Sequence, residues 1–82
     1  MEKITLKFPF RNAAGQSIEK LEIKRLKRAD MKAAQRHSKD AAEQEDYLLA
    51  KMSGLTVEDI DQLDLADSKQ LLDSFRAMVG VD

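Results

Sequence analysis

Apolar and polar residues alternate at the start of the chain, in the stretch "KITLKFPF". Ile4, Leu6, Phe8 and Phe10 fall on one face, and polar residues or Pro9 fall between them. A period of two is typical of a β-strand with one buried face. Proline has no N–H to donate to a strand ladder, so the strand either lies at a sheet edge or keeps Pro9 on its unpaired side.

A second alternating run follows after "RNAAGQ", whose Asn12 and Gly15 suit turn conformations. The sequence therefore predicts a β-hairpin with strands at about 3–10 and 18–26. Ile18 and Leu26 fall on the opposite parity from the other apolar residues of the second run, which a bulge or the strand ends would absorb. A lone hairpin is marginally stable, so we expect helices to cover its apolar face.

The remainder of the chain has helical patterning. Asp30 is suited to cap a helix over 31–38, and Asp40 a helix over 41–53 that ends at Gly54. The apolar stripe weakens near Lys39, which favours a break between two helices there. One continuous helix over residues 31–53 remains the alternative. Further helices are predicted over 57–63 and 65–79, the latter ended by Gly80. The expected fold class is α+β, with a hairpin followed by three or four helices in one domain over residues 1–82.

The last predicted helix has the clearest apolar face. Five residues follow helical spacing on one side of it: Leu71, Leu72, Phe75, Met78 and Val79. In a chain of 82 residues such a face usually belongs to the core. It is also the candidate partner-binding surface of this sequence, and the two roles are compatible.

The stretch "SGLTVEDIDQLDLAD" carries five acidic residues and raises the question of a calcium loop. Starting an EF-hand at Asp59 places Leu63 at position 5, Asp64 at position 6 and Gln70 at position 12, where an oxygen ligand, glycine and glutamate are required. Helix capping explains the acids better. Thr56 with Asp59, and Asp64 with Asp67, each precede an apolar stripe and complement a helix dipole.

Charge is unevenly distributed along the chain. Residues 1–40 hold eleven Lys and Arg against five Asp and Glu, whereas residues 41–82 hold three against ten, for a net charge of −1. This asymmetry suits a charged partner, self-association, or attraction between the two halves of the fold. The basic run "KRLKR" lacks interleaved aromatics, so a solvated strand end or a surface that meets the acidic half is favoured over a nucleic-acid site.

The residues needed for catalysis or metal binding are scarce. There is no cysteine, and the one histidine, His37, lies in a polar stretch without a nucleophile signature. Ser68 in "ADSKQLL" is placed like the modified serine of an acyl carrier, but those proteins have no N-terminal hairpin, and an ordinary first-turn serine is favoured. We expect no enzymatic activity, no cofactor and no metal. No apolar run approaches the roughly 18 residues of a membrane span, so a soluble, cytoplasmic protein is expected.

The order of these features resembles the tail assembly chaperone family of Mu-like and P2-like contractile-tailed phages and their prophages. The similarity covers nearly the whole chain and is best in "LLAKMSGLT", Leu48 to Thr56, followed by Ile60, Leu63 and Asp67. It implies a small cytoplasmic protein of the bacterial host cell. Such a chaperone coats the long, helical tape-measure protein, keeps it soluble during tail assembly and is absent from the mature tail.

The resemblance leaves other partners open, namely the tail-tube protein, a longer form of the chain made by translational frameshifting, and a second copy of the chain. The ending "MVGVD" would match the short form. Neither nucleic acid nor membrane is implied as a partner. The alternative hypothesis is a generic protein–protein interaction adaptor of prophage or bacterial origin.

Overall fold

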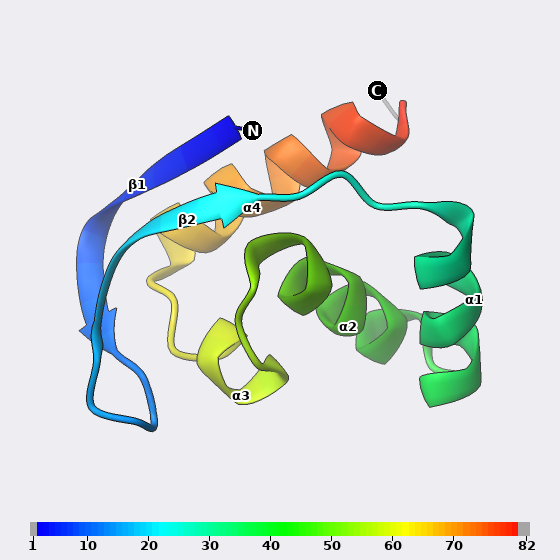
Figure 1. Ribbon diagram of the computed structural model, residues 1–82, viewed down its shortest axis with the longest axis horizontal. Helices are drawn as coiled ribbons and strands as arrows, with labels where there is room; N and C mark the ends of the chain where they lie inside the picture. The colour runs from blue at the N-terminus through cyan, green and yellow to red at the C-terminus, as the bar shows by residue number, and fades with distance from the viewer. Residues whose placement is uncertain (1, 81–82) are drawn as a thin grey trace.

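A computed structural model describes residues 2–80, so Met1, Val81 and Asp82, the ends of the predicted domain, lie outside the described residues. The chain forms a hairpin followed by helices (Figure 1), which confirms the α+β prediction. In order, the elements are β1 (Glu2–Arg11), β2 (Ser17–Ile23), α1 (Arg28–His37), α2 (Ala41–Ser53), α3 (Val57–Ile60) and α4 (Leu65–Val79).

The hairpin is antiparallel and contains a large irregularity in β1. Thr5 pairs with Lys20 and Phe10 pairs with Ile18, so four residues of β1 stand opposite a single residue of β2. The bend that results is visible in the ribbon, where β1 curves sharply halfway along (Figure 1). Pro9 lies inside this unpaired stretch, as its missing N–H predicts.

The bulge reverses the predicted position of one aromatic residue. The alternation placed Phe8 on the buried face with Ile4 and Leu6, but Phe8 is 56% exposed, whereas the two aliphatic residues are buried. The extra residues break the two-residue period at this point, so Phe8 lies outside the core, whereas Phe10 is half-buried and packs against it. The sequence prediction for Phe8 is wrong.

A carboxylate from the last helix accepts hydrogen bonds from backbone N–H groups in the bulge. Asp67, in the first turn of α4, is fully buried and accepts hydrogen bonds from the backbone N–H groups of Lys7 (2.9 Å) and Phe8 (3.0 Å). Buried backbone donors without a partner are costly, and the two carboxylate oxygens supply one acceptor to each. Asp67 therefore fixes α4 against β1, which goes beyond its predicted role in the helix dipole.

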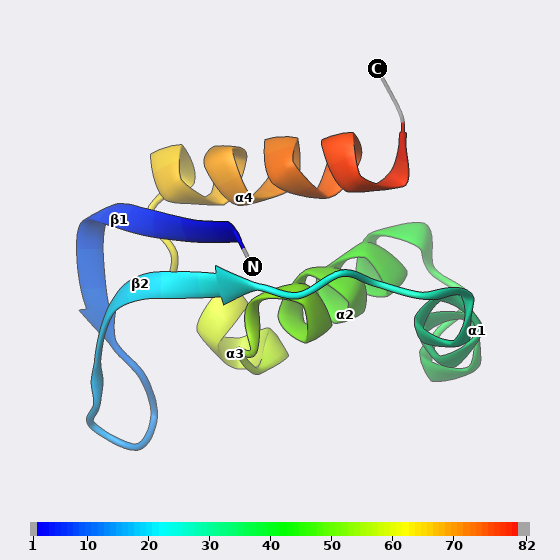
Figure 2. The ribbon, with the colours of Figure 1, turned by 45° about the horizontal axis from the view of Figure 1, so that its top comes forward.

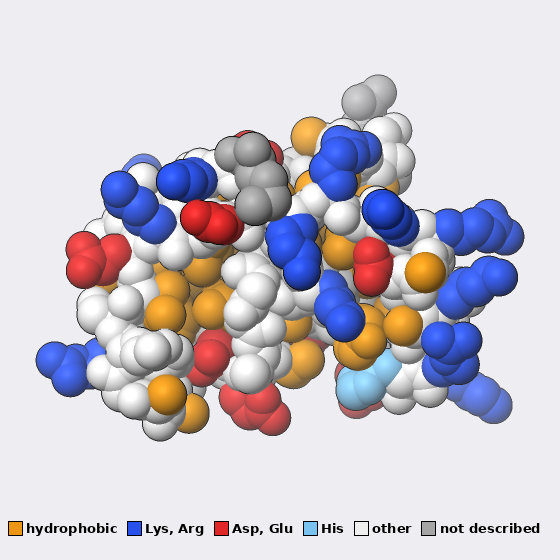
Figure 3. Space-filling model, viewed as in Figure 1, with side chains coloured by type: hydrophobic (Ala, Val, Ile, Leu, Met, Phe, Trp, Pro, Cys, Tyr) orange, Lys and Arg blue, Asp and Glu red, His pale blue; other side chains and the backbone are white. Residues whose placement is uncertain are grey.

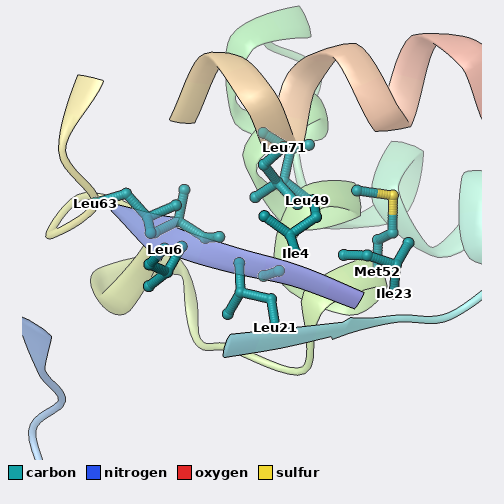
Figure 4. Packing of buried hydrophobic residues seen from close by; sticks show 10 residues of the cluster. Ile4, Leu6, Leu21, Ile23, Leu49, Met52, Leu63 and Leu71 are labelled. Carbon is teal, nitrogen blue, oxygen red and sulfur yellow. The ribbon is translucent and has the colours of Figure 1, made fainter. Parts of the chain in front are cut away.

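The apolar face of the hairpin packs against two helices. α4 lies along β1 and α2 lies against β2, and the two helices also contact each other (Figure 2). Figure 4 shows Ile4 and Leu21 of the strands close to Leu49 of α2 and Leu71 of α4. Met52 and Leu71 are completely buried in this cluster, so the core is formed jointly by the hairpin and both long helices.

Local capping sets the bounds of most helices. Asp40 accepts from the Glu43 N–H, Thr56 from the Asp59 N–H, and Asp64 from the Ala66 N–H, so three of the four predicted N-caps are confirmed. Gly54 and Gly80 end α2 and α4 with φ of 75° and 77° in the left-handed region. The predicted break between residues 38 and 41 is also confirmed, because α1 ends at His37 and α2 begins at Ala41.

Three predicted boundaries are wrong for identifiable reasons. α1 begins at Arg28, because Asp30 is its third residue and accepts from the Lys27 N–H (2.8 Å) instead of capping a helix that starts at 31. α3 stops at Ile60, since residues 61–63 form tight turns. β2 ends at Ile23, after which the Lys24 N–H donates to the Met52 carbonyl of α2 (2.9 Å).

Candidate partner-binding groove

The predicted partner-binding stripe of α4 divides between the core and the surface. Leu71 is completely buried and contributes to the core. Phe75 and Met78 are half-buried and pack against the core, while Val79 is 44% exposed. Leu72 is half-buried on a different side, beside Leu65. The stripe is therefore not one open face, and its last three residues are those that line an open groove.

This α1/α4 groove has a volume of about 220 Å³. The buried Leu48 of α2 forms its floor, Met31 of α1 lines one side, and Phe75, Met78 and Val79 of α4 line the other. Leu26 and Lys27, from the segment before α1, and Arg28, the first residue of α1, complete the lining. α1 packs chiefly against α2, which leaves the space between α1 and α4 open.

A hydrogen bond holds the end of α4 next to the segment that leads into α1. The backbone N–H of Leu26 donates to the Met78 sulfur at 3.3 Å. The adjacent Lys24 N–H is held by α2, so this segment is attached to both long helices between the end of β2 and the start of α1. The attachment fixes where α1 begins, and with it the position of the groove wall opposite α4.

Basic side chains lie on the α1 side of the groove. Lys27 and Arg28 line it and are exposed, and Figure 3 shows Lys and Arg side chains gathered over α1, with apolar atoms between them. Among residues 2–80, the one ion pair joins Lys69 to Asp73 (3.1 Å), both from the acidic half of the chain. The predicted attraction between the two halves thus forms no ion pair in this part of the chain.

A second apolar hollow lies at the start of α4. Leu65 is 84% exposed and shares this hollow with Ala66, Ser68, Lys69 and Leu72. All of its lining comes from one exposed helix side, whereas the α1/α4 groove is built from three helices and a connecting segment. Concave sites that several elements line can enclose a ligand side chain, so the α1/α4 groove is the better candidate.

The other features considered in the sequence are His37, a metal site and a membrane span. His37 is exposed, and its ring centroid lies 5.0 Å from that of Tyr47. Within residues 2–80, no group of three His, Asp or Glu side chains is arranged to hold a metal ion. None of the helices in the described range has both the length and the apolar character needed to cross a bilayer.

Two groove residues were not singled out from the sequence. Met31 and Leu48 belong to different helices, and only the packing of α1 on α2 brings them beside α4. Leu26 did carry a signal, because it broke the parity of the second strand. The exposed Met31 gave none, since a methionine near the start of an amphipathic helix is ordinary.

The family of the chain follows from comparison with known proteins. A family model described as "Phage tail assembly chaperone proteins, E, or 41 or 14" matches residues 3–80. Since the match covers almost all of the 82 residues, the chain belongs to this family of phage tail assembly chaperones. No curated protein and no solved structure matches the chain.

Proposed function

We propose that this chaperone binds the tape-measure protein of a contractile tail, keeps it soluble while the tail assembles, and is absent from the mature tail. The proposal rests on the family match over residues 3–80 together with an open apolar groove at the C-terminal end of α4. The chain acts by binding and not by catalysis, in the cytoplasm of the bacterial host. Its partner contacts are Phe75, Met78 and Val79 of the predicted stripe, with Leu72 outside the groove.

A groove between two helices is a common way to receive the apolar side of a third helix. A tape-measure protein is expected to be a long helix whose apolar side chains are exposed until tube subunits surround it. The α1/α4 groove offers methionines on both walls, Met31 and Met78, and methionine side chains adapt to differently shaped partners. A chaperone that must bind many positions along one helix benefits from such a lining.

The small size of the groove suits reversible binding. Its 220 Å³ admits one large or two small apolar side chains, whereas an obligate interface buries several thousand Å² of surface. Contacts of this extent form and break readily, because they offset only part of the entropy lost on association. Release is required if tube subunits are to replace the chaperone on the tape-measure protein.

The first test is co-expression with the long, predominantly helical protein whose reading frame is expected to follow this gene. We expect the two proteins to co-purify in the soluble fraction and the long protein to be insoluble when expressed alone. A long protein that is soluble by itself and does not associate with this chain would overturn the proposal and favour the generic adaptor.

Matched substitutions on α4 locate the contact. Val79→Gln removes an exposed apolar residue from the groove, and Leu65→Gln removes one from the other end of the same helix. We expect Val79→Gln to reduce the soluble yield of the partner and Leu65→Gln to leave it unchanged, with both variants folded by circular dichroism. Phe75→Ala should also reduce the yield, but Phe75 packs against the core, so it is informative only if the variant remains folded.

A further inference from the structure

We infer that the α1/α4 groove receives an amphipathic helical segment whose apolar stripe is flanked by acidic residues. The inference rests on the proposed function and specifies which part of a long partner this chaperone selects. It follows from three properties of the groove: its apolar lining, its basic surroundings and its volume.

The charge argument begins with Lys27 and Arg28. Both side chains are exposed, both line the groove, and neither forms an ion pair within the described residues 2–80. Lys32 and Arg36 are exposed on α1 as well. A helix whose apolar side chains entered this groove would place its flanking residues beside these cations. Acidic flanks would be attracted there, whereas basic flanks would be repelled.

The volume sets the number of apolar side chains that enter. A cavity of about 150 Å³ holds a benzene ring, so 220 Å³ receives one large or two small apolar side chains. On a helix, two neighbouring side chains of one face are three or four residues apart. The expected segment therefore presents apolar residues at i and i+3 or i+4, with Asp or Glu on either side of them.

A second copy of this chain is a poorer occupant. Its most exposed large apolar side chain in the described range is Leu65, at the start of α4. The residues three and four positions after Leu65 are Ser68 and Lys69, which are polar, so this part of α4 lacks a second apolar side chain at the spacing stated above. The acidic helix α2 offers no alternative, because Leu48, Leu49 and Met52 of its apolar side are buried.

The experiment uses a photo-cross-linking amino acid placed at Met31, inside the groove, and a control placed at Leu65, outside it. Each variant is co-expressed with the long helical partner and irradiated, and mass spectrometry identifies the cross-linked partner segment. We expect cross-links from position 31 and none from position 65. The segment attached to position 31 should carry apolar residues at the stated spacing and acidic residues beside them.

A charge-reversal pair then tests the electrostatic part. Arg28→Glu should weaken binding of a synthetic peptide of that segment roughly tenfold at low salt, and changing the acidic flanks of the peptide to lysine should restore it. Arg28 is the first residue of α1, where an acidic side chain favours the helix, so the fold is preserved. Lys20→Glu, on the exposed side of β2, is the matched control and should leave binding unchanged.

Each contrary outcome has a separate meaning. A cross-linked segment with basic flanks, or an Arg28→Glu variant that binds normally, overturns the inference while the chaperone proposal stands. Cross-links from position 31 to another copy of this chain overturn it in favour of self-association. If the unmodified protein forms no complex with the long partner at all, the proposed function fails together with the inference.

Discussion

The carboxylate of Asp67 accepts a hydrogen bond from the backbone N–H of Lys7 across 60 residues of sequence, at 2.9 Å. Its second oxygen accepts from the next N–H in the same bulge of β1. The first turn of the last helix thus supplies the acceptors that β2 cannot offer where pairing is interrupted. The buried carboxylate of Asp67 thus determines where the start of α4 packs on the hairpin.

Asp67→Ala should therefore destabilise the fold by about 2–4 kcal/mol, because two partly buried backbone donors lose their charged acceptors. Urea titration of the unfolding free energy measures the effect. Asp73→Ala, which removes a surface ion pair with Lys69, is the control and should cost less than about 1 kcal/mol. Equal losses of unfolding free energy for the two variants would show that the N–H groups in the bulge do not depend on Asp67.

Leu71→Ala should cost about 2–5 kcal/mol, because a completely buried leucine leaves both its transfer free energy and a cavity behind. Leu65→Ala, six residues earlier on the same helix, removes an 84% exposed side chain and should change stability by less than about 0.5 kcal/mol. Thermal or urea unfolding of both variants checks the assignment of α4 residues to core and surface. A stable Leu71→Ala protein would contradict it.

Asp46 is predicted to make stability depend on pH. Partial burial, followed by repulsion from Asp61, Asp40 and Glu43, raises the pKa of its carboxyl above the unfolded value of 3.8. Between these two pKa values the folded protein binds more protons than the unfolded one, so stability falls as the pH rises through that window. The penalty is fully present above the folded pKa and absent below 3.8.

Asp46→Asn should consequently raise the Tm at neutral pH, and its advantage over the unmodified protein should disappear as the pH falls below 3.8. Differential scanning calorimetry of the pair over a pH series provides the comparison. The difference between the two proteins isolates this carboxyl from the other groups that titrate. An Asp46→Asn variant with a lower Tm at neutral pH would refute the proposed penalty from burial and repulsion of this carboxyl.

Gly54 ends α2 with a φ of 75°, and a Cβ added there would meet no atom within 4 Å. Gly54→Ala should cost about 1–2 kcal/mol from backbone conformation alone. Gly54→Asn should cost less, because asparagine tolerates the left-handed region better than alanine. Urea unfolding of the two variants tests this order, and an alanine variant as stable as the unmodified protein would contradict it.

The sequence predicts α2 and α4 at their observed bounds because both ends of each helix carry local signals. Asp40 and Gly54 flank the first, and Asp64 and Gly80 flank the second. Such caps act within a few residues and are readable without the fold. The start of α1 was missed because Asp30 acts from inside the first turn, and its residue type alone does not separate that role from an N-cap.

Long-range contacts account for what the sequence did not predict. Phe8 is exposed because it lies in a bulge of β1. The N–H of Phe8 in that bulge donates to the carboxylate of Asp67, 59 residues away. The candidate groove likewise requires Met31, Leu48 and Val79 to meet, and no periodicity within one helix contains that information. The stripe of α4 was recognised, but its division between core and groove depends on where α1 and α2 pack.

The contact between β1 and α4 also orders events during synthesis. The hairpin leaves the ribosome before α4, yet the N–H groups in its bulge have their acceptor in α4. Ser74 of that helix also donates to Glu2 of β1 (2.8 Å). Because Leu71 fills the same core, residues 2–64 alone retain an open apolar face. The nascent chain therefore completes this fold, and the groove that depends on it, only once α4 has emerged from the ribosome.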